Sequence, residues 1–371
     1  MTSHNLHNLH IEHYRSLRDL RLTLQHVTVI QGANGCGKSN LYRALRLLPA
    51  AATGRLAEAF AAEGGMPSVL YAGPKRRDEI REMRLAIGVS FAEFTYRLTC
   101  GLPLPSASIF KLDPEVKEED LGVKVSSRRT PVPLCQRRSL VVTMPDAEGR
   151  MTTFTDPLDQ AESVLSQLAD PRRWPELALT RQCFAGWRFY HQFRTDPEAP
   201  ARQPRLGVRS PVLSEDGANL AAVLQTIREW HDGGAELDDA LEAAFPGCAL
   251  EIAGDARGHL AVAWRQPGIH RTFDARELSD GTLRFLCLAA ALLTPKPPLL
   301  LVLNEPETSL HPALLPALAR LIARAGERCQ LIVTTHAAEL SAAITAQCDA
   351  AVVKLELTNG QTRIQGERGS L

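Results

Sequence analysis

The stretch Gln31-Gly32-Ala33-Asn34-Gly35-Cys36-Gly37-Lys38-Ser39-Asn40 decides the fold of this chain. It satisfies the pattern G-x-x-x-x-G-K-[ST], with the first glycine at residue 32. An apolar run predicts a strand over residues 26–30, and apolar residues at helical spacing predict a helix over residues 41–48. Glycines let the loop backbone curl so that its N–H groups point into one nest, and the helix adds the positive end of its dipole. The stretch therefore predicts a site for a triphosphate.

Each residue of the loop has an expected role at that site. Lys38 is expected to reach the β- and γ-phosphates of ATP, and the Ser39 hydroxyl is expected to bind Mg²⁺. The candidate nucleotide-binding residues are Gly32, Asn34, Gly35, Cys36, Gly37, Lys38, Ser39 and Asn40. The alternative, an ordinary Gly-rich turn, is weakened by the motifs further along the chain.

The composition is that of a globular protein and excludes several other classes. Apolar residues make up 44% and charged residues 23% of the 371 residues, and the longest apolar run, around residues 283–293, is too short to span a membrane. The N-terminus lacks a signal-peptide pattern, so we expect a cytoplasmic protein. The eight cysteines form no C-x-x-C pair, which argues against a zinc site or a disulfide framework. Lys+Arg and Asp+Glu balance at 42 each, so net charge does not indicate nucleic acid.

The hydrophobic pattern predicts three parts along the chain. Residues 1–193 form the first segment of a core, which joins the phosphate loop to an antiparallel β-subdomain. Strand-like alternation includes residues 108–112, whereas the charged stretch from Glu115 to Asp120 predicts a solvated loop. Residues 194–256 are expected to be a helical insertion, with helices near 217–231 and 236–245. Residues 257–371 form the second core segment.

The second half of the predicted nucleotide site follows a buried strand. Residues 299–303 are continuously apolar, which is typical of a strand covered on both faces, and Asn304 and Glu305 follow directly. Phosphoryl-transfer enzymes hold Mg²⁺ and the attacking water at such a strand end. Asn304 stands at the metal position, where Asp is usual, so Mg²⁺ is expected to bind more weakly. Glu305 is placed to orient or deprotonate water; the alternative is a carboxylate that only caps the next turn.

Two further strand and helix ends carry candidate residues. Ser279 or Asp280 is predicted to be the N-cap of a helix that runs to Leu293, and a capped helix N-terminus is also an anion site. A buried strand over residues 330–335 ends at His336. This histidine is either structural or placed to hydrogen-bond a γ-phosphate.

The order of these motifs resembles that of the ABC-type ATPases, specifically the RecF- and SMC-like branch and the stand-alone bacterial ATPases related to the ATPase part of OLD-family proteins. The resemblance rests on the phosphate loop with Asn40, Leu278-Ser279-Asp280-Gly281, the strand with its acidic end, residues 309–312 (S-L-H-P), residues 334–336 (T-T-H), and residues 14–17 (Y-R-S-L). It covers roughly residues 5–48 and 275–356. It implies an α/β P-loop NTPase with an ABC-ATPase-like core sheet, an adjoining antiparallel β-subdomain and a helical insertion.

The resemblance also implies a head-to-head homodimer that encloses two ATP molecules with Mg²⁺. It assigns a role to each matched residue: Lys38 and Ser39 bind phosphate and metal, Ser279 and Gly281 of the second chain contact the γ-phosphate, Glu305 is the general base, His336 senses the γ-phosphate, and residues 309–311 cross the dimer seam. A glutamine that links the metal to the helical insertion is also expected. Gln192 is the candidate.

The function predicted from the sequence is ATP hydrolysis that drives dimerisation as a conformational switch, in DNA repair or maintenance or in anti-phage defence. An ATP-binding sensor with negligible hydrolysis, which regulates a separately encoded effector such as a nuclease, is the alternative, because Asn304 replaces the usual Asp. Direct action on DNA is a third reading. It rests on basic clusters at residues 75–77, 128–129, 137–138 and 202–209. A transporter subunit fits the signature less well, and no membrane partner is expected.

Overall fold

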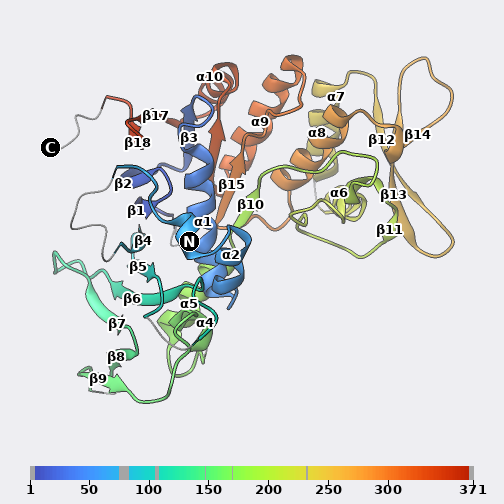
Figure 1. Cartoon of the computed structure of the whole chain (residues 1–371). Helices are drawn as coiled ribbons and strands as arrows, with labels where there is room; N and C mark the ends of the chain where they lie inside the picture. Colours follow the sequence, from blue (N-terminus) through green and yellow to red (C-terminus); the bar gives the residue numbers. More distant parts are fainter. Residues whose placement is uncertain are drawn as a thin grey trace. The chain divides into compact units, whose positions relative to one another are not determined.

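The computed structural model describes residues 5–74, 83–104, 108–146, 148–168, 170–230 and 233–366, and Figure 1 shows their helices and strands along the chain. The chain forms two compact units. Unit 1 comprises Met1–Gln25, Gly32–Trp187 and Val353–Leu371, and unit 2 comprises His26–Gln31 and Arg188–Val352. No helix within the described ranges is long and apolar enough to cross a membrane. The division at residues 193 and 256 stays a prediction.

Unit 1 is built on an antiparallel sheet with the order β2-β1-β4-β5-β6-β7-β8-β9. Its strands within the described residues are β1 (Asn8–Tyr14), β2 (Leu17–Thr23), β4 (Leu85–Ser90), β5 (Phe94–Gly101), β6 (Glu115–Val123), β7 (Val132–Arg138), β8 (Val141–Pro145) and β9 (Met151–Phe154). Alternating apolar residues place one face of each strand in the core, as in β1, where Leu9 and Ile11 are buried. The predicted antiparallel β-subdomain is confirmed.

The prediction of a solvated loop from Glu115 to Asp120 is wrong, because these residues belong to β6. Glu119 is only 1% exposed, and its carboxylate accepts hydrogen bonds from the Tyr96 hydroxyl, the Ser163 hydroxyl and the Val164 backbone N–H. Burial raises the pKa of Glu119, and these hydrogen bonds oppose the shift. This charged stretch is therefore a strand. Its buried carboxylate, Glu119, accepts hydrogen bonds from residues distant in sequence.

The strand predicted over residues 108–112 is also wrong. These residues form turns and bends in which Ile109 and Phe110 are 85% and 65% exposed. The apolar alternation there resembles that of a half-buried strand, but no neighbouring strand pairs with it among the described residues.

The helices of unit 1 begin with the one that follows the phosphate loop. They are α1 (Lys38–Ala52), α2 (Leu56–Ala62), α3 (Met66–Val69), α4 (Val164–Gln167) and α5 (Pro175–Ala185). Leu41, Leu45 and Leu48 are buried at helical spacing along α1, which is the face that anchors this helix. The hairpin of β17 (Ala351–Thr358) and β18 (Gln361–Ile364) ends the described chain.

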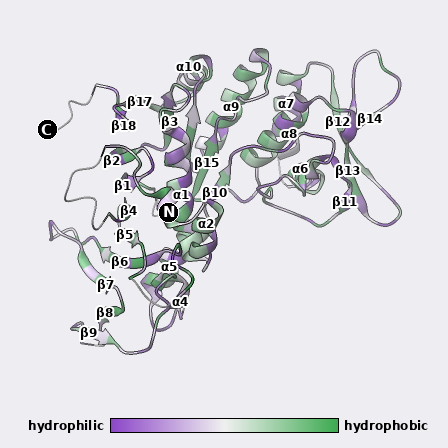
Figure 2. Ribbon diagram, in the orientation of Figure 1, coloured by the Kyte–Doolittle hydropathy of each residue, from purple (hydrophilic) through white to green (hydrophobic). Residues whose placement is uncertain are grey.

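Unit 2 contains a parallel sheet with the order β10-β15-β16-β3. The strands are β10 (Arg188–Tyr190), β15 (Leu300–Asn304), β16 (Gln330–Thr335) and β3 (Val27–Gly32), the last up to Gln31. All residues of β15 and β16 are buried, as predicted for strands covered on both faces, and the apolar residues of β15 are green in Figure 2. Asn304 is in register with Thr334, and Thr335 with Gln31. The carboxyl ends of three strands therefore lie at one edge.

Helices and a small antiparallel sheet complete unit 2. The helices are α6 (Leu220–Arg228), α7 (Gly233–Ala244), α8 (Asp280–Leu292), α9 (Leu315–Gly326) and α10 (Ala338–Gln347), the short turns are η1 (Pro200–Arg202), η2 (Ala275–Glu277) and η3 (Pro312–Leu314), and the strands are β11 (Arg205–Leu206), β12 (Ala249–Gly254), β13 (His259–Arg265) and β14 (Phe273–Asp274). The two helices predicted near 217–231 and 236–245 are confirmed as α6 and α7.

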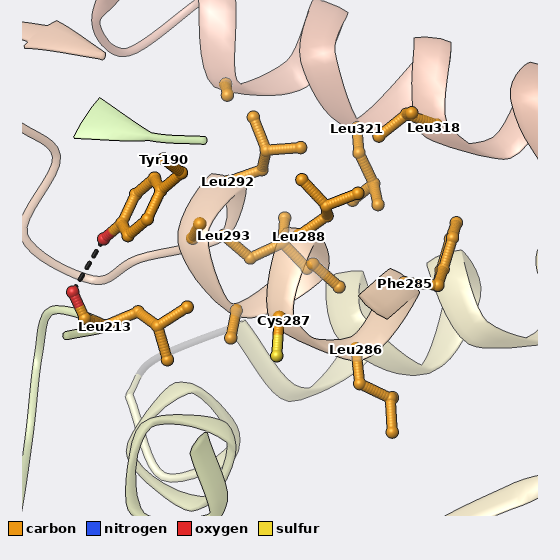
Figure 3. Packing of buried hydrophobic residues seen from close by; sticks show 14 of the residues in the cluster. Tyr190, Leu213, Phe285, Leu286, Cys287, Leu288, Leu292, Leu293, Leu318 and Leu321 are labelled. Carbon is orange, nitrogen blue, oxygen red and sulfur yellow. Dashed lines mark hydrogen bonds between the residues drawn. The ribbon is translucent and has the colours of Figure 1, made fainter. Parts of the chain in front are cut away.

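The core of unit 2 fixes α8, the helix that carries the signature residues at its N-terminus. Leu288 and Leu292 of α8 and Leu318 and Leu321 of α9 belong to one buried cluster (Figure 3). Tyr190 of β10 joins the same cluster and donates its hydroxyl hydrogen to the backbone oxygen of Leu213 at 2.7 Å. The sheet edge and the start of α8 are therefore held by one continuous core.

Candidate nucleotide site

The phosphate loop is a left-handed turn that delivers Lys38 to the first turn of α1. Gly35 and Gly37 have φ of 79° and 107°, values that favour glycine. Gly37 is the N-cap and has no side chain to occupy the N–H groups of the first helical turn. Lys38 is 2% exposed, and its Nζ donates to the backbone oxygens of Gly32 (2.8 Å) and Ala33 (3.0 Å). A left-handed loop, a helix N-terminus and a lysine in one place fit a polyphosphate.

Hydrogen bonds within unit 1 clamp this loop. Thr362 Oγ1 donates to the Cys36 backbone oxygen at 2.8 Å and lies 2.7 Å from Ser16 Oγ. Asn40 Nδ2 donates to the same Ser16 hydroxyl at 2.8 Å. Asn40, a predicted nucleotide-binding residue, and Ser16 therefore also hold the loop in place, while Asn34 is exposed and Ser39 is half-buried.

Gly37→Ala is expected to weaken ATP binding about tenfold or more, because an Ala side chain is strained at φ of 107° and its Cβ would lie 2.1 Å from Thr362 Oγ1. The hydroxyl cannot move without losing its bond to Cys36. Gly35→Ala is the matched control, since φ there is 79° but the added Cβ meets nothing within 4 Å. Titration with a fluorescent ATP analogue checks this result, and equal losses in both variants would contradict the steric argument.

Asn304 lies at the carboxyl end of β15 and is 1% exposed. Its Oδ1 accepts from the Thr334 hydroxyl at 2.8 Å, and its Nδ2 donates to His191 Nδ1 at 2.7 Å. His191 directly follows β10, so the side chain of Asn304 joins all three neighbouring strand ends. Sequence reasoning missed His191. The adjacent Gln192, predicted to link the metal to the helical insertion, is exposed, and its metal role stays a prediction.

Glu305 occupies a left-handed turn immediately after β15. Its φ is 48°, and its backbone N–H donates to the Thr334 backbone oxygen at 2.9 Å. Arg284 of α8, which is 2% exposed, donates to the Glu305 backbone oxygen at 3.2 Å. The Glu305 carboxylate is thus 25% exposed, while the backbone of its turn is fixed by hydrogen bonds to Thr334 and Arg284.

A second carboxylate, Glu307, lies in the same turn and is 6% exposed. Its Oε1 accepts from the Thr335 hydroxyl (2.5 Å) and the His336 backbone N–H (3.0 Å), and lies 3.2 Å from His336 Nδ1. His336 Nδ1 lies 3.8 Å from Glu305 Oε1. The structure therefore brings Glu305 and His336 together as predicted. Sequence reasoning missed Glu307, although its place two residues after Glu305 was a usable signal.

The signature residues begin α8. The Ser279 side chain accepts from the Thr282 backbone N–H at 3.1 Å, which confirms Ser279 as the N-cap. A Cβ at Gly281 would lie 3.1 Å from the backbone oxygen of Ser309, so glycine keeps the start of α8 close to the Ser309 turn. Ser309 itself has φ of 64°, and the His311 side chain caps η3.

Arg202 fastens the segment before α8 from the inside. Only 4% exposed, its guanidinium donates to the backbone oxygens of Ala275 (2.7 Å) and Leu278 (2.8 Å) and to Asp280 Oδ1 (2.9 Å). The sequence placed Arg202 in an exposed basic connector. Its true role is internal, because a buried arginine can satisfy several carbonyl groups at once.

No group of three or more His, Cys, Asp or Glu side chains in the described part of the chain is arranged to hold a metal ion. The side chains that offer oxygen donors suited to Mg²⁺ are the Asn304 amide and the Glu305 carboxylate in unit 2 and, in unit 1, the Ser39 hydroxyl. Mg²⁺ usually takes one or two protein oxygens and fills its other positions with phosphate oxygens and water, so each unit by itself has donors that fit the metal.

Comparison with known families places the chain. The family model described as "AAA domain, putative AbiEii toxin, Type IV TA system" matches residues 123–342, more than half of the chain. The chain belongs to this AAA family. A second model, described as "AAA domain", matches residues 8–68, which contain the phosphate loop of this AAA chain. No curated protein matches its sequence.

Solved structures show the fold of this AAA-family chain. An SMC head bound to the C-terminal winged-helix domain of ScpA has a TM-score of 0.54 and 14% identity, with 97% of each chain covered. An SMC head with an extended coiled coil, bound to the C-terminal domain of ScpA derived from Pyrococcus furiosus, has a TM-score of 0.51 and 11% identity, with 97% of this chain and 95% of that chain covered. The predicted P-loop NTPase fold of the ABC and SMC-like type is confirmed.

Proposed function

We propose that the chain binds ATP and Mg²⁺ with the residues of the phosphate loop and of the Glu305 turn, and that it hydrolyses ATP to ADP and phosphate. The observation that carries this proposal is the register of the parallel sheet in unit 2. Asn304 is in register with Thr334, and Thr335 with Gln31, so the catalytic candidates leave the sheet at the edge where the chain enters the phosphate loop. Ligands of open α/β sheets bind at this edge.

Each residue has one task in the proposed reaction. The Lys38 ammonium and the N–H groups at the start of α1 hold the β- and γ-phosphates, while Ser39 and Asn304 would hold Mg²⁺, which neutralises phosphate charge. Glu305 accepts a proton from the attacking water. His336 contacts the γ-phosphate from the end of β16, and Ser279 and Gly281 contact it from a second copy of the chain.

We further propose that ATP closes a head-to-head homodimer, which switches a partner protein in the cytoplasm. The SMC heads in the comparison are bound to ScpA domains, which supports a protein partner. The family description names a toxin–antitoxin system, which supports defence over DNA repair as the setting.

A direct DNA contact has less support from the basic clusters. Arg137 is buried, Arg138 pairs with Asp120, and Arg209 pairs with Glu229. The cluster at residues 75–77 lies outside the described residues. DNA binding that weakens steeply with salt would restore this reading.

Incubation with Mg²⁺ and ATP tests the proposal through two readouts, phosphate release and the dimeric fraction in sedimentation velocity. Hydrolysis predicts repeated turnover and a dimer that disappears as ATP is consumed. The alternative, an ATP sensor for a separately encoded effector, is favoured by Asn304. It predicts stoichiometric bound ATP that persists for hours in a single-turnover measurement, and that result would overturn hydrolysis.

Asn304→Asp is expected to tighten Mg²⁺ binding and raise turnover, by about tenfold at low Mg²⁺, because a second carboxylate is placed at the metal position. The new Asp would still accept from Thr334 and would accept from His191 once Nδ1 of that ring carries the proton. The Mg²⁺ dependence of phosphate release measures the effect. An unchanged dependence would mean that Asn304 only joins the strand ends.

A further inference from the structure

Glu307 is the buried carboxylate for which the proposed reaction has no task. It follows β15, and the hydrogen bonds to its carboxylate come from residues at the end of β16 in the same compact unit. One oxygen, Oε1, faces the Thr335 hydroxyl, the His336 backbone N–H and the His336 ring. The other oxygen, Oε2, is buried and makes no hydrogen bond with any described residue. Side-chain carboxylates are rarely buried in this way without a specific purpose.

A buried arginine adds positive charge near the same turn. Arg284 of α8 is 2% exposed, and its Nε makes no hydrogen bond with the described residues. Burial lowers the pKa of the Arg284 guanidinium, and the nearby Glu307 and Glu305 carboxylates oppose that shift. The Arg284 guanidinium therefore attracts both carboxylates of the turn.

The His336 ring lies closer to Glu307 than to Glu305. His336 Nδ1 lies 3.2 Å from Glu307 Oε1 but 3.8 Å from Glu305 Oε1. Glu307 Oε1 also accepts a hydrogen bond from the backbone N–H of His336. The same oxygen therefore contacts both the backbone and the ring of His336. The ring is 40% exposed, so the opposite nitrogen, Nε2, is the one able to meet a ligand.

We propose that Glu307 is a positioning residue: it accepts the Nδ1 proton of His336 and thereby directs Nε2 toward the γ-phosphate. This inference rests on the proposed function for its consequence in turnover. The orientation and the tautomer of His336 are properties of the protein alone, and they can be tested without nucleotide.

Glu307→Gln tests the proposal, because the amide keeps the shape and an oxygen acceptor for Thr335 and the His336 N–H but lacks the negative charge that favours a proton on His336 Nδ1. In nucleotide-free protein, ¹⁵N NMR of the histidine rings should show His336 protonated at Nδ1, and Glu307→Gln should move the proton to Nε2. The chain has 11 histidines, so the His336→Gln spectrum assigns the signal. A wild-type ring without a proton on Nδ1 would overturn the inference and leave the proposed function standing.

The kinetic arm of the test uses a matched control. Glu307→Gln should lower kcat about tenfold or more while the KM for ATP changes less than threefold, because the base and sensor are misplaced but the phosphate loop is intact. Glu339→Gln removes the same charge from an exposed site three residues after His336 and should behave as wild type. Glu307→Asp should recover part of the turnover. Equal kcat in Glu307→Gln and wild type would overturn the proposal, and thermal melting of both Glu307 variants identifies any loss of fold.

Discussion

Glu305→Gln is expected to lower ATP turnover by about 100-fold or more while ATP binding stays within a few-fold of wild type. General base catalysis contributes about 10²- to 10⁴-fold, and an amide cannot accept the proton of water at neutral pH. The backbone of the turn should survive, because its contacts to Thr334 and Arg284 use main-chain atoms of residue 305. Gln also has no branch at Cβ that would resist φ of 48°.

The same substitution should prolong the ATP-bound dimer, since the nucleotide that closes it is no longer consumed. Single-turnover phosphate release and sedimentation velocity on one sample measure both consequences. Glu339→Gln provides the charge-matched control. Full turnover in Glu305→Gln would mean that the Glu305 carboxylate only caps the turn, which is the structural alternative to a general base.

The parts of the site that the sequence predicted are those whose chemistry is local. The phosphate loop needs glycines at positive φ, and Gly35 and Gly37 have it. A continuous apolar run marks a strand covered on both faces, and β15 and β16 are such strands. The Ser279 side chain caps α8 by accepting from the Thr282 backbone N–H three residues later, so the pattern could be recognised within four residues.

The parts that were missed depend on partners distant in sequence. Glu119 and Arg202 look like solvated charges, but each is buried by groups that lie more than 20 residues away along the chain. The contact of His191 with Asn304 was missed because it arises from the pairing of β10 with β15. Glu307 is bonded by Thr335 and His336, which lie at the end of the neighbouring strand. Strand order, which a single sequence does not state, decides each of these cases.

The signature helix and the Glu305 turn are mechanically linked in unit 2. Arg284 of α8 holds the backbone of residue 305, and Arg202 holds the segment just before α8. In the proposed dimer, a nucleotide that binds Ser279 would therefore also act on the turn that carries the proposed base. This link is a physical route by which dimer closure would affect the proposed hydrolysis.

Lys38→Ala is expected to weaken ATP binding by about 10- to 100-fold and to abolish both phosphate release and ATP-dependent dimerisation. A hydrogen bond to a charged group contributes about 1.5–3 kcal/mol, and the ammonium would make such bonds to two phosphates. The side chain is 2% exposed, so no other cation on the surface can take its place by a rotamer change.

The substitution also removes the bonds from Nζ to the Gly32 and Ala33 backbone oxygens, which makes loop damage the competing explanation. Thermal melting separates the two effects, because α1 and its buried face should hold the unit together in the variant. Lys296→Ala, at an exposed lysine between α8 and β15, controls for the loss of one positive charge. If the Lys38→Ala protein still dimerises with ATP, the nucleotide does not bind at the phosphate loop. The proposed role of Glu305 as general base would then also be wrong.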